Sequence, residues 1–320
     1  MKDSLRRLSL NGWVMLVSIV LLALAPTITT WMDDPFLLDL IMRMVILSIA
    51  AVSLNLILGY GGMISFGHAA YIGIGAYSVG IPAYYEIHSG LFQLGVTVVV
   101  CALFAFITGY ICLRTKGVYF IMITLAFAQM IFFALVSIEE YGGDDGLVIY
   151  QRSTFEFGPD LGSDISLYYT CVVVLTLALL IVHKIVNSRF GLVIRGSAGN
   201  DARLMSLGIP TFRYRLVCYV IAGVICGVAG WLLGNFTNFI SPEMMDWTRS
   251  GELIFMVVLG GAGSLFGPVL GAVAYLTIEE VLSGITIYWQ LPFGILLVLV
   301  VLFGKGGLTG LIAKIGRGDK

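Results

Sequence analysis

Residues 91–112 read LFQLGVTVVVCALFAFITGYIC and contain no charged side chain. About 20 predominantly apolar residues in a helix cross the ~30 Å hydrocarbon core of a bilayer. Only helices and closed barrels satisfy every backbone hydrogen bond in that environment. The segment is therefore predicted to be a transmembrane helix, and comparable segments recur along the chain.

The composition of the whole chain excludes a water-soluble globule. Of its 320 residues, 59% are hydrophobic and 12% are charged, and the mean hydropathy is +0.98. This leaves too little polar sequence to cover a soluble surface. We expect an all-α integral membrane protein, a polytopic helical bundle of about 8–10 transmembrane segments in a single domain, residues 1–320. The expected segments are residues 11–30, 36–58, 62–84, 91–112, 118–138, 167–186, 216–236, 251–262, 266–281 and 291–303.

Two of these segments leave the number of crossings open. Residues 251–262 and 266–281 are short and are separated by a glycine turn. Eight crossings result if both re-enter without spanning, and ten if each spans. The first segment, 11–30, follows Lys2, Arg6 and Arg7, as a signal peptide would. Residues 23–25 (ALA) resemble a cleavage site, but Pro26 would directly follow the cut, where proline is poorly tolerated. A retained first helix is therefore favoured.

Charged residues are sorted by loop. Basic side chains gather in residues 114–116, 184–215 and 305–320, whereas acidic side chains dominate the loop 139–166. Lysine and arginine favour cytoplasmic loops. Both termini and the loop 187–215 are therefore predicted to be cytoplasmic, and the loop 139–166 periplasmic.

The cytoplasmic loop contains the signals of a short helix. Asn200 can cap its start, and Asp201 places a negative charge at its positive end. Gly208 suits the left-handed residue that closes a helix, and Pro210 prevents continuation. Such a helix is marginal alone and must dock on something. It could rest on its own bundle, but docking into a partner's groove is favoured, through a face formed by Leu204 and Leu207 with Met205 beside it.

Several polar residues interrupt the apolar segments: Arg43, Asn55, His68, Gln129 and Glu252. Ionisable groups inside a membrane usually face a bundle interior or water. For His68 and Gln129, hydrogen bonding between helices is favoured, with lining of a transport pathway as the alternative. Arg43 is expected to reach the outer face. Glu279 and Glu280 are expected near the outer surface, with no special role.

Glycine-rich and small-residue patterns indicate close helix packing. The stretches 61–67 and 260–267 resemble each other, which suggests an internal repeat around a translocation path. Small residues at four-residue spacing allow helix backbones to approach closely in lipid. One such series is Ala222, Cys226, Gly230 and Gly234; another is Ser65, Ala69 and Gly73. Packing within the bundle is favoured for them over a subunit interface.

The sequence lacks the motifs of several enzyme classes. Lys305 follows Gly304 but precedes Gly306, so no phosphate-binding loop of the G-x-x-x-x-G-K-[ST] type is present. No HExxH or Ser/His/Asp arrangement occurs, and the five cysteines form no C-x-x-C pair. We expect no catalytic residue, metal or cofactor in this chain, and no nucleic-acid partner.

Four stretches resemble a known family. Residues 53–62 read SLNLILGYGG and 65–70 read SFGHAA, similar to the LN-LxxGYxGxxSxGHAAF stretch of LivM-type permeases. Residues 116–120 (KGVYF) with 124–129 (TLAFAQ) resemble the RGxYFAMxTLAFAQ region, and 142–147 (GGDDGL) the TGGxDGL loop. Residues 257–264 (VVLGGAGS) with 267–272 (GPVLGA) resemble the late glycine-rich segment. LivM-type permeases are membrane subunits of bacterial ABC importers for branched-chain amino acids.

The resemblance implies a multi-pass subunit of the bacterial inner membrane. Its implied partners are a second, LivH-like permease, two cytoplasmic ABC ATPases that use ATP and magnesium, and a periplasmic solute-binding protein. The ATPase-coupling loop would comprise Arg195, Asn200, Asp201, Arg203, Leu204, Leu207 and Gly208, although Arg203 and Met205 depart from the family pattern RENExxAExLGI. The translocation path would involve Asn55, Gly61, Gly62, His68, Tyr119, Gln129, Glu252, Gly260 and Gly261.

The cargo implied by the resemblance is leucine, isoleucine or valine. Sibling permeases that carry urea or short amides share these motifs and remain an alternative. A remote alternative is an ion-coupled secondary transporter, which usually carries acids in mid-membrane helices. Only Glu252 is a plausible acid of that kind here.

Overall fold

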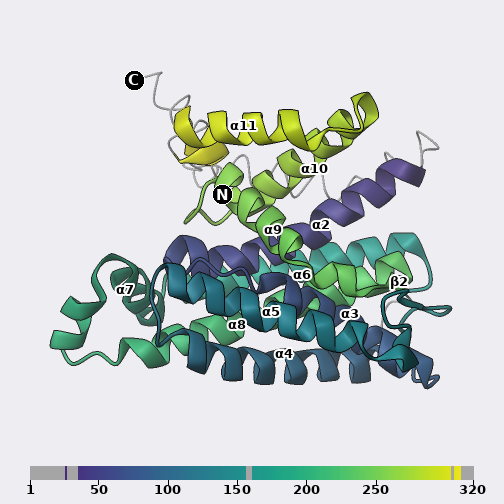
Figure 1. Ribbon diagram of the computed structural model, residues 1–320, viewed down its shortest axis with the longest axis horizontal. Coiled ribbons are helices and arrows are strands. Elements are labelled where there is room, and N and C mark those ends of the chain that lie inside the picture. The colour runs from purple at the N-terminus through teal and green to yellow at the C-terminus, as the bar shows by residue number, and fades with distance from the viewer. Residues whose placement is uncertain (1–25, 27–34, 156–160, 304–305, 311–320) are drawn as a thin grey trace, which may run out of the picture.

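The computed structural model describes residues 26, 35–155, 161–303 and 306–310, which form a bundle of helices (Figure 1). The long helices are α2 (Pro35–Asn55), α3 (His68–Tyr84), α4 (Gly90–Cys112), α5 (Val118–Val136), α6 (Asp164–Val186), α7 (Arg189–Ser206), α8 (Thr211–Thr237), α9 (Trp247–Gly260), α10 (Gly267–Ile285) and α11 (Gln290–Phe303). The predicted all-α membrane fold is confirmed.

Short elements complete the fold. A single π-helical turn, η2 (Leu56–Tyr60), continues α2, and the 3-10 turns are η3 (Glu139–Tyr141) and η4 (Pro242–Met245). The strands β1 (Leu147–Val148) and β2 (Phe239–Ile240) pair antiparallel. We call the end of the bundle with β1, β2, η3 and η4 the hairpin end, and the end with α7 and residues 113–117 the α7 end (Figure 1).

Six helices among the described residues are long and apolar enough to cross a membrane. They are Phe36–Tyr60, Gly90–Cys112, Val118–Val136, Asp164–Val186, Thr211–Thr237 and Gly267–Ile285. The helix α10 thus reaches spanning length, whereas α9, with 14 residues, does not. The expected segment 11–30 lies outside the described residues, apart from Pro26.

The third segment starts later than its apolar composition suggests. It was expected from residue 62, but α3 begins at His68. Gly62 has a φ of +64°, a left-handed conformation that cannot continue a right-handed helix. The stretch between η2 and α3 is therefore an unwound connection, in which Gly62 and Ile64 are exposed.

The helices α2, α3 and α8 form the centre of the bundle. The buried share of the most apolar stretch is 78% for Phe36–Tyr60 and 67% for α8, but only 28% for α4 and 17% for α5. Large side chains on the outer helices, such as Val99, Leu103 and Phe133, are exposed. Covering these faces requires lipid or another membrane subunit.

Small residues bring α3 and α8 into backbone contact. A Cβ on Gly75 would collide with the carbonyl oxygen of Gly227, and a Cβ on Gly230 with that of Ile72. This confirms that the small-residue series on α8 packs inside the bundle. Packing at this distance is driven by van der Waals contact, because lipid supplies no hydrophobic force between helices.

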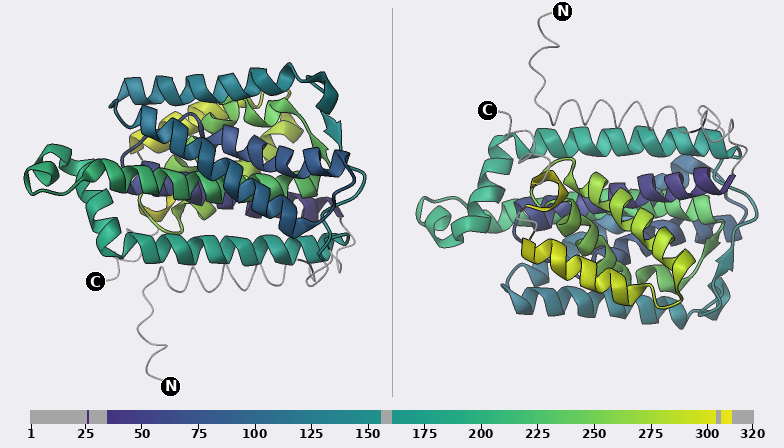
Figure 2. Two further views of the ribbon diagram at one scale, coloured as in Figure 1. Left: turned by 90° about the horizontal axis from the view of Figure 1, so that it is seen from below. Right: turned by 90° about the horizontal axis from the view of Figure 1, so that it is seen from above.

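Views from below and from above show how α7 is placed (Figure 2). In both views α6 lies along one edge of the bundle, and α7 projects beyond the end. The basic loops of the described chain lie at the α7 end, and the acidic residues of η3 at the hairpin end. The two ends therefore differ in charge, as the loop pattern predicts.

Candidate functional site

The segment at the α7 end contains the predicted short helix, attached to a longer one. Backbone dihedrals break at Asn200 (φ −154°, ψ 94°), and its side-chain Oδ1 accepts the N–H of Arg203 at 3.0 Å. Gly208 has a φ of +80°, and the N–H of Ile209 donates to the carbonyl of Leu204 at 3.2 Å. Both predicted caps are confirmed.

The sequence did not indicate the helix that precedes this kink. The first part of α7 starts after Ser188, whose hydroxyl accepts the N–H of Gly191. Arg195 extends back to the preceding helix and donates to the carbonyl of Val186 at 3.2 Å. A helical arm therefore carries the short helix, and Arg195 ties that arm to the end of α6.

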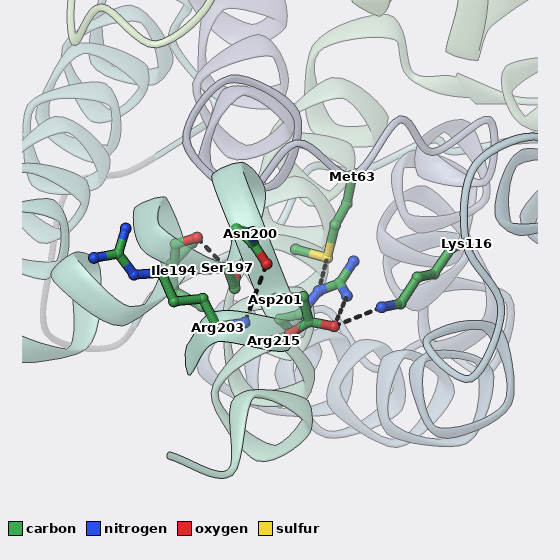
Figure 3. Close-up of polar contacts among 8 residues, drawn as sticks. All are labelled: Met63, Lys116, Ile194, Ser197, Asn200, Asp201, Arg203 and Arg215. Atoms are coloured by element: carbon green, nitrogen blue, oxygen red, sulfur yellow. Dashed lines mark hydrogen bonds and ion pairs between the residues drawn. The ribbon is translucent and has the colours of Figure 1, made fainter. Parts of the chain in front are cut away.

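An ion network joins the short helix to two other elements (Figure 3). The Asp201 carboxylate accepts from Lys116 Nζ at 2.8 Å and lies 3.8 Å from Arg215 Nη1. Arg215, near the start of α8, also donates from Nε to Met63 Sδ at 3.4 Å. Desolvation opposes ionisation of Asp201, but the hydrogen bond from Lys116 and the charges of Lys116 and Arg215 outweigh it and lower the pKa of the carboxyl below its usual 3.8.

A cavity of about 290 Å³ lies beside this network. Its lining includes the glycine turn at Gly61 and Gly62, the Lys116 loop and Asp201. A Cβ on Gly62 would lie 3.2 Å from the Cβ of Ala198 on α7. The unwound connection before α3 is therefore in contact with the arm that carries the short helix.

The apolar side chains of the short helix divide into two groups. Leu207 and Met205 are exposed at 68% and 51% of their surface, whereas Leu204 is half-buried and packs back towards Gly196. The prediction that Leu204 and Leu207 present one docking face is therefore wrong for Leu204, because the kink at Asn200 folds it against the arm. The exposed apolar tip consists of Met205 and Leu207.

The glycine turn between α9 and α10 meets the end of α2 at Asn55. Its Nδ2 donates to the carbonyl of Ser264 at 2.8 Å, and its Oδ1 accepts the N–H of Gly263 at 2.9 Å. A Cβ on Gly59 would collide with the backbone nitrogen of Gly263. Asn55 is 1% exposed, so this side chain occupies the contact between the two halves of the chain.

The remaining predicted glycines shape the connection from α9 to α10. Gly260 is buried so closely that a Cβ would collide with the carbonyl oxygen of Gly267. Gly261 ends α9 with a φ of +112°. Together they allow a sharp reversal that brings Gly263 to Asn55.

The predicted hydrogen bonds of His68 and Gln129 are wrong. Neither ring nitrogen of His68 has a hydrogen-bond partner in the described chain, and neither does Nε2 of Gln129. The His68 ring is fully buried and faces the edge of Tyr71, with centroids 5.5 Å apart. Tyr119 is 76% exposed on α5 and joins none of these residues.

A charged pocket of about 220 Å³ lies near the hairpin end, with Thr237 and Met244 in its wall. Glu252 on α9 pairs with Arg249 at 3.0 Å, and Arg43 on α2 pairs with Glu279 on α10 at 3.4 Å. The expectations that Arg43 extends to the outer face and that Glu279 is merely solvated are corrected, because α2 and α10 pack side by side. Arg249 was not predicted from sequence as a partner of Glu252, although a spacing of three residues on a helix indicates such a pair.

No group of three or more His, Cys, Asp and Glu side chains in the described residues could hold a metal ion. All five cysteines are free and buried. The ion pairs of Asp201 with Arg215 and of Arg43 with Glu279, and the hydrogen bonds of Asn55, join different elements, whereas the pair of Arg249 and Glu252 lies within α9.

The sequence of this chain resembles those of a known protein family and of other known proteins. The family model described as "Branched-chain amino acid transport system / permease component" matches residues 36–302. The high-affinity branched-chain amino acid transport system permease protein LivM of Salmonella typhimurium is 26% identical over 94% of this chain and 76% of its own length. The probable LivM permease of Methanocaldococcus jannaschii is 26% identical over 81% of this chain and 89% of its own.

A shorter similarity extends to a second type of permease. The LivH permease protein of Escherichia coli is 34% identical over 126 residues, which cover 38% of this chain and 40% of its own. No solved structure matches the chain.

Proposed function

We propose that this chain, which belongs to the family of permease components of branched-chain amino acid transport systems, is one of two membrane-spanning subunits of an ABC importer. Its cargo would be leucine, isoleucine or valine. A second, LivH-like permease would complete the pore, two cytoplasmic ATPases would drive it, and a periplasmic solute-binding protein would deliver the cargo. The location would be the bacterial inner membrane, with both termini in the cytoplasm.

The short helix 201–207 is the observation that carries this proposal. It stands outside the bundle, is capped at Asn200 and Gly208, and exposes Met205 and Leu207. Isolated exposed apolar residues are ordinary, but a helix of this length gains stability only from contacts. An ATPase groove that covers Met205 and Leu207 would supply them.

The ion network supplies a route by which a push on this helix would reach the membrane. Asp201 contacts both the Lys116 loop, which precedes α5, and Arg215 in α8. The Gly62 turn rests on Ala198 of the same arm. Movement of the arm would therefore act on α5, on α8 and on the unwound start of α3, and rigid-body rocking of such elements is an established kind of transition.

The residues proposed to act in coupling are Arg195, Asn200, Asp201, Arg203, Met205, Leu207 and Gly208. In this set Arg195 ties the arm to α6, and the backbone N–H of Arg203 completes the cap at Asn200. Asp201 would transmit the movement. The proposed path includes Asn55, Gly61, Gly62, His68, Gln129, Glu252, Gly260 and Gly261. The unpaired buried nitrogens of His68 and Gln129 support a place on the path, because buried polar groups are ordinarily satisfied.

Purification from the native membrane tests the proposal. We expect two ATPase subunits and a second permease to accompany the chain, and reconstituted vesicles to accumulate leucine only when ATP and the binding protein are present. Accumulation of solute against its gradient by this subunit alone would contradict the proposal. Cargo is tested separately, by measuring which amino acids, urea or amides the cognate binding protein retains.

A further inference from the structure

The charged pocket lies where α2, α3, α8 and α9 meet near the hairpin end. Three charged side chains line it: Arg43, Arg249 and Glu252. The rest of the wall is mainly apolar and includes Leu47, Ile72, Leu233, Leu253 and Met256. The cavity therefore combines both signs of charge with an apolar surface.

The charges of the pocket form a balanced set. Arg249 pairs with Glu252, Arg43 pairs with Glu279, and Glu279 also interacts electrostatically with Arg249 and Glu252. The side chains of Arg249 and Glu252 keep 45% and 26% of their surface exposed, so a solute in the cavity can contact both. Ionisable residues within a membrane-spanning bundle are by default candidates for a substrate pathway.

A free aliphatic amino acid matches this arrangement. Its ammonium and carboxylate groups are carried by one α-carbon, and the Arg249 and Glu252 side chains meet at 3.0 Å. A zwitterion can therefore replace the contact between them with one ion pair to each, without changing the net charge of the site. Charge-assisted hydrogen bonds of this kind are the strong ones. Its branched side chain would then lie against Leu253, Met256 and the adjacent apolar wall.

We propose that this pocket is a transit site for the zwitterion of an aliphatic amino acid, with the carboxylate at Arg249 and Arg43 and the ammonium at Glu252. The inference rests on the proposed importer function and adds to it the chemistry that the permease itself recognises. Urea and short amides carry no separated charges and would use only part of the site. The pocket therefore favours an amino acid over an amide as the cargo.

Protection of an introduced thiol tests the site directly. All five native cysteines are buried, and Met244 lines the pocket and is half-buried. The importer carrying Met244→Cys, with its partner subunits and in nanodiscs, is treated with a small polar maleimide in the absence of binding protein. We expect leucine to slow labelling in a saturable manner. Leucinamide, 4-methylpentanoate and urea, which each lack one or both charges, should protect poorly.

Charge variants in the same background identify the side chains involved. Glu252→Gln and Arg249→Gln should each weaken leucine protection about tenfold, as expected for the loss of one charged hydrogen bond. Glu280→Gln is the matched control, because Glu280 lies on the same helix as Glu279 but does not line the pocket. The double variant Arg249→Glu with Glu252→Arg exchanges the two charges and keeps an ion pair between these positions. It should therefore regain protection if the pair has only a structural role. We expect it not to restore protection.

Three outcomes would overturn the proposal while the importer function stands. One is leucine uptake by the importer with no protection of the thiol; another is full recovery of protection by the charge exchange. The third is equal protection by leucinamide, which would contradict the zwitterion site. An importer that accumulates urea but no amino acid would instead contradict the proposed cargo, and the transit site with it.

Discussion

Gly208 ends the short helix in a conformation that few residues adopt. Its φ is +80°, and a Cβ there would meet no atom within 4 Å. Any effect of substitution must therefore come from the backbone and not from a clash. A β-branched residue in the left-handed region costs about 1–3 kcal/mol. We predict that Gly208→Val lowers leucine uptake several-fold while the amount of protein in the membrane is unchanged.

Two variants separate this effect from general damage. Gly208→Asn should retain more uptake than Gly208→Val, because asparagine tolerates the left-handed region. Gly199→Ala is the matched control: it lies next to Asn200, also meets nothing within 4 Å, and has no positive φ. Equal uptake by Gly208→Val and wild type would contradict the idea that this cap is required for coupling.

Asn55 is the second residue with a testable structural role. Asn55→Leu keeps similar size but leaves the N–H of Gly263 and the carbonyl of Ser264 without their partner. Each unsatisfied buried group costs about 1–3 kcal/mol. We predict that Asn55→Leu unfolds at a lower temperature in detergent than Ser53→Ala does. Ser53→Ala is the control, because it removes a hydrogen bond to the carbonyl of Ala50 within the same helix. Equal stability of the two variants would contradict the proposed bridge.

The residues that could be predicted from sequence are those whose partners are close in the chain. The caps at Asn200 and Gly208 depend on neighbours within a few positions, so their residue types sufficed. The pairing of Arg43 with Glu279 spans 236 positions and depends on the packing of α2 against α10. No local pattern encodes it, and both residues were expected to face water.

At the scale of elements, α7 shows a limit of sequence patterns. Its first part contains Gly191 and Gly196, which lower helix propensity and so hide the helix. Burial of Ile194 and Ser197 against the bundle overrides that preference. The opposite error occurs at α3, where an apolar composition suggested helix from residue 62 and the Gly62 turn prevents it.

The link between α7 and the bundle should depend on pH through Asp201. The pKa of this carboxyl is lower in the folded protein than its usual 3.8. Its stabilisation is therefore fully present above about pH 4 and is lost as the pH falls through the lower, folded-state pKa. We predict that pepsin cleaves Asp201→Asn faster than wild type near pH 4, and that the difference disappears in stronger acid.

The size of this effect is limited by solvent. The Lys116 side chain is 64% exposed, and exposed ion pairs contribute about 0.2–1 kcal/mol. The expected difference in cleavage rate is therefore a few-fold. Arg203→Gln is the control, because Arg203 contributes only its backbone N–H to the cap. A wild-type to Asp201→Asn ratio that stays constant with pH would contradict the role of the carboxylate.

At the scale of the whole molecule, apolar composition predicted the six described helices that are long enough to cross a membrane, but not which of them are central. The spans Phe36–Tyr60 and Val118–Val136 are equally apolar, yet protein covers 78% of the first and 17% of the second. The difference arises from the neighbours of each helix, because α2 packs against α6, α8, α9 and α10, whereas α5 lies at the edge of the bundle with little helix contact. Hydropathy measures the free energy of transferring a side chain from water into lipid. Because lipid tails are about as apolar as the neighbouring helices, hydropathy does not distinguish a helix that faces lipid from one that faces other helices.

The orientation of the bundle is the remaining prediction, and labelling of single introduced cysteines measures it. The basic α7 end should face the cytoplasm, because lysine and arginine are retained there. We therefore expect Tyr150→Cys, at a residue 97% exposed beyond β1, to react with an impermeant maleimide in intact cells. Leu207→Cys should react only in inside-out vesicles, and more slowly while the ATPases are bound.

The native cysteines should give little background in this experiment, since all five are buried. Leu103→Cys, at an exposed position on the outer helix α4, should react from neither side because lipid covers it. Its reaction from water would contradict the placement of the bundle across the membrane. Labelling of Leu207→Cys in intact cells would reverse the orientation, and the short helix could then no longer receive a cytoplasmic ATPase.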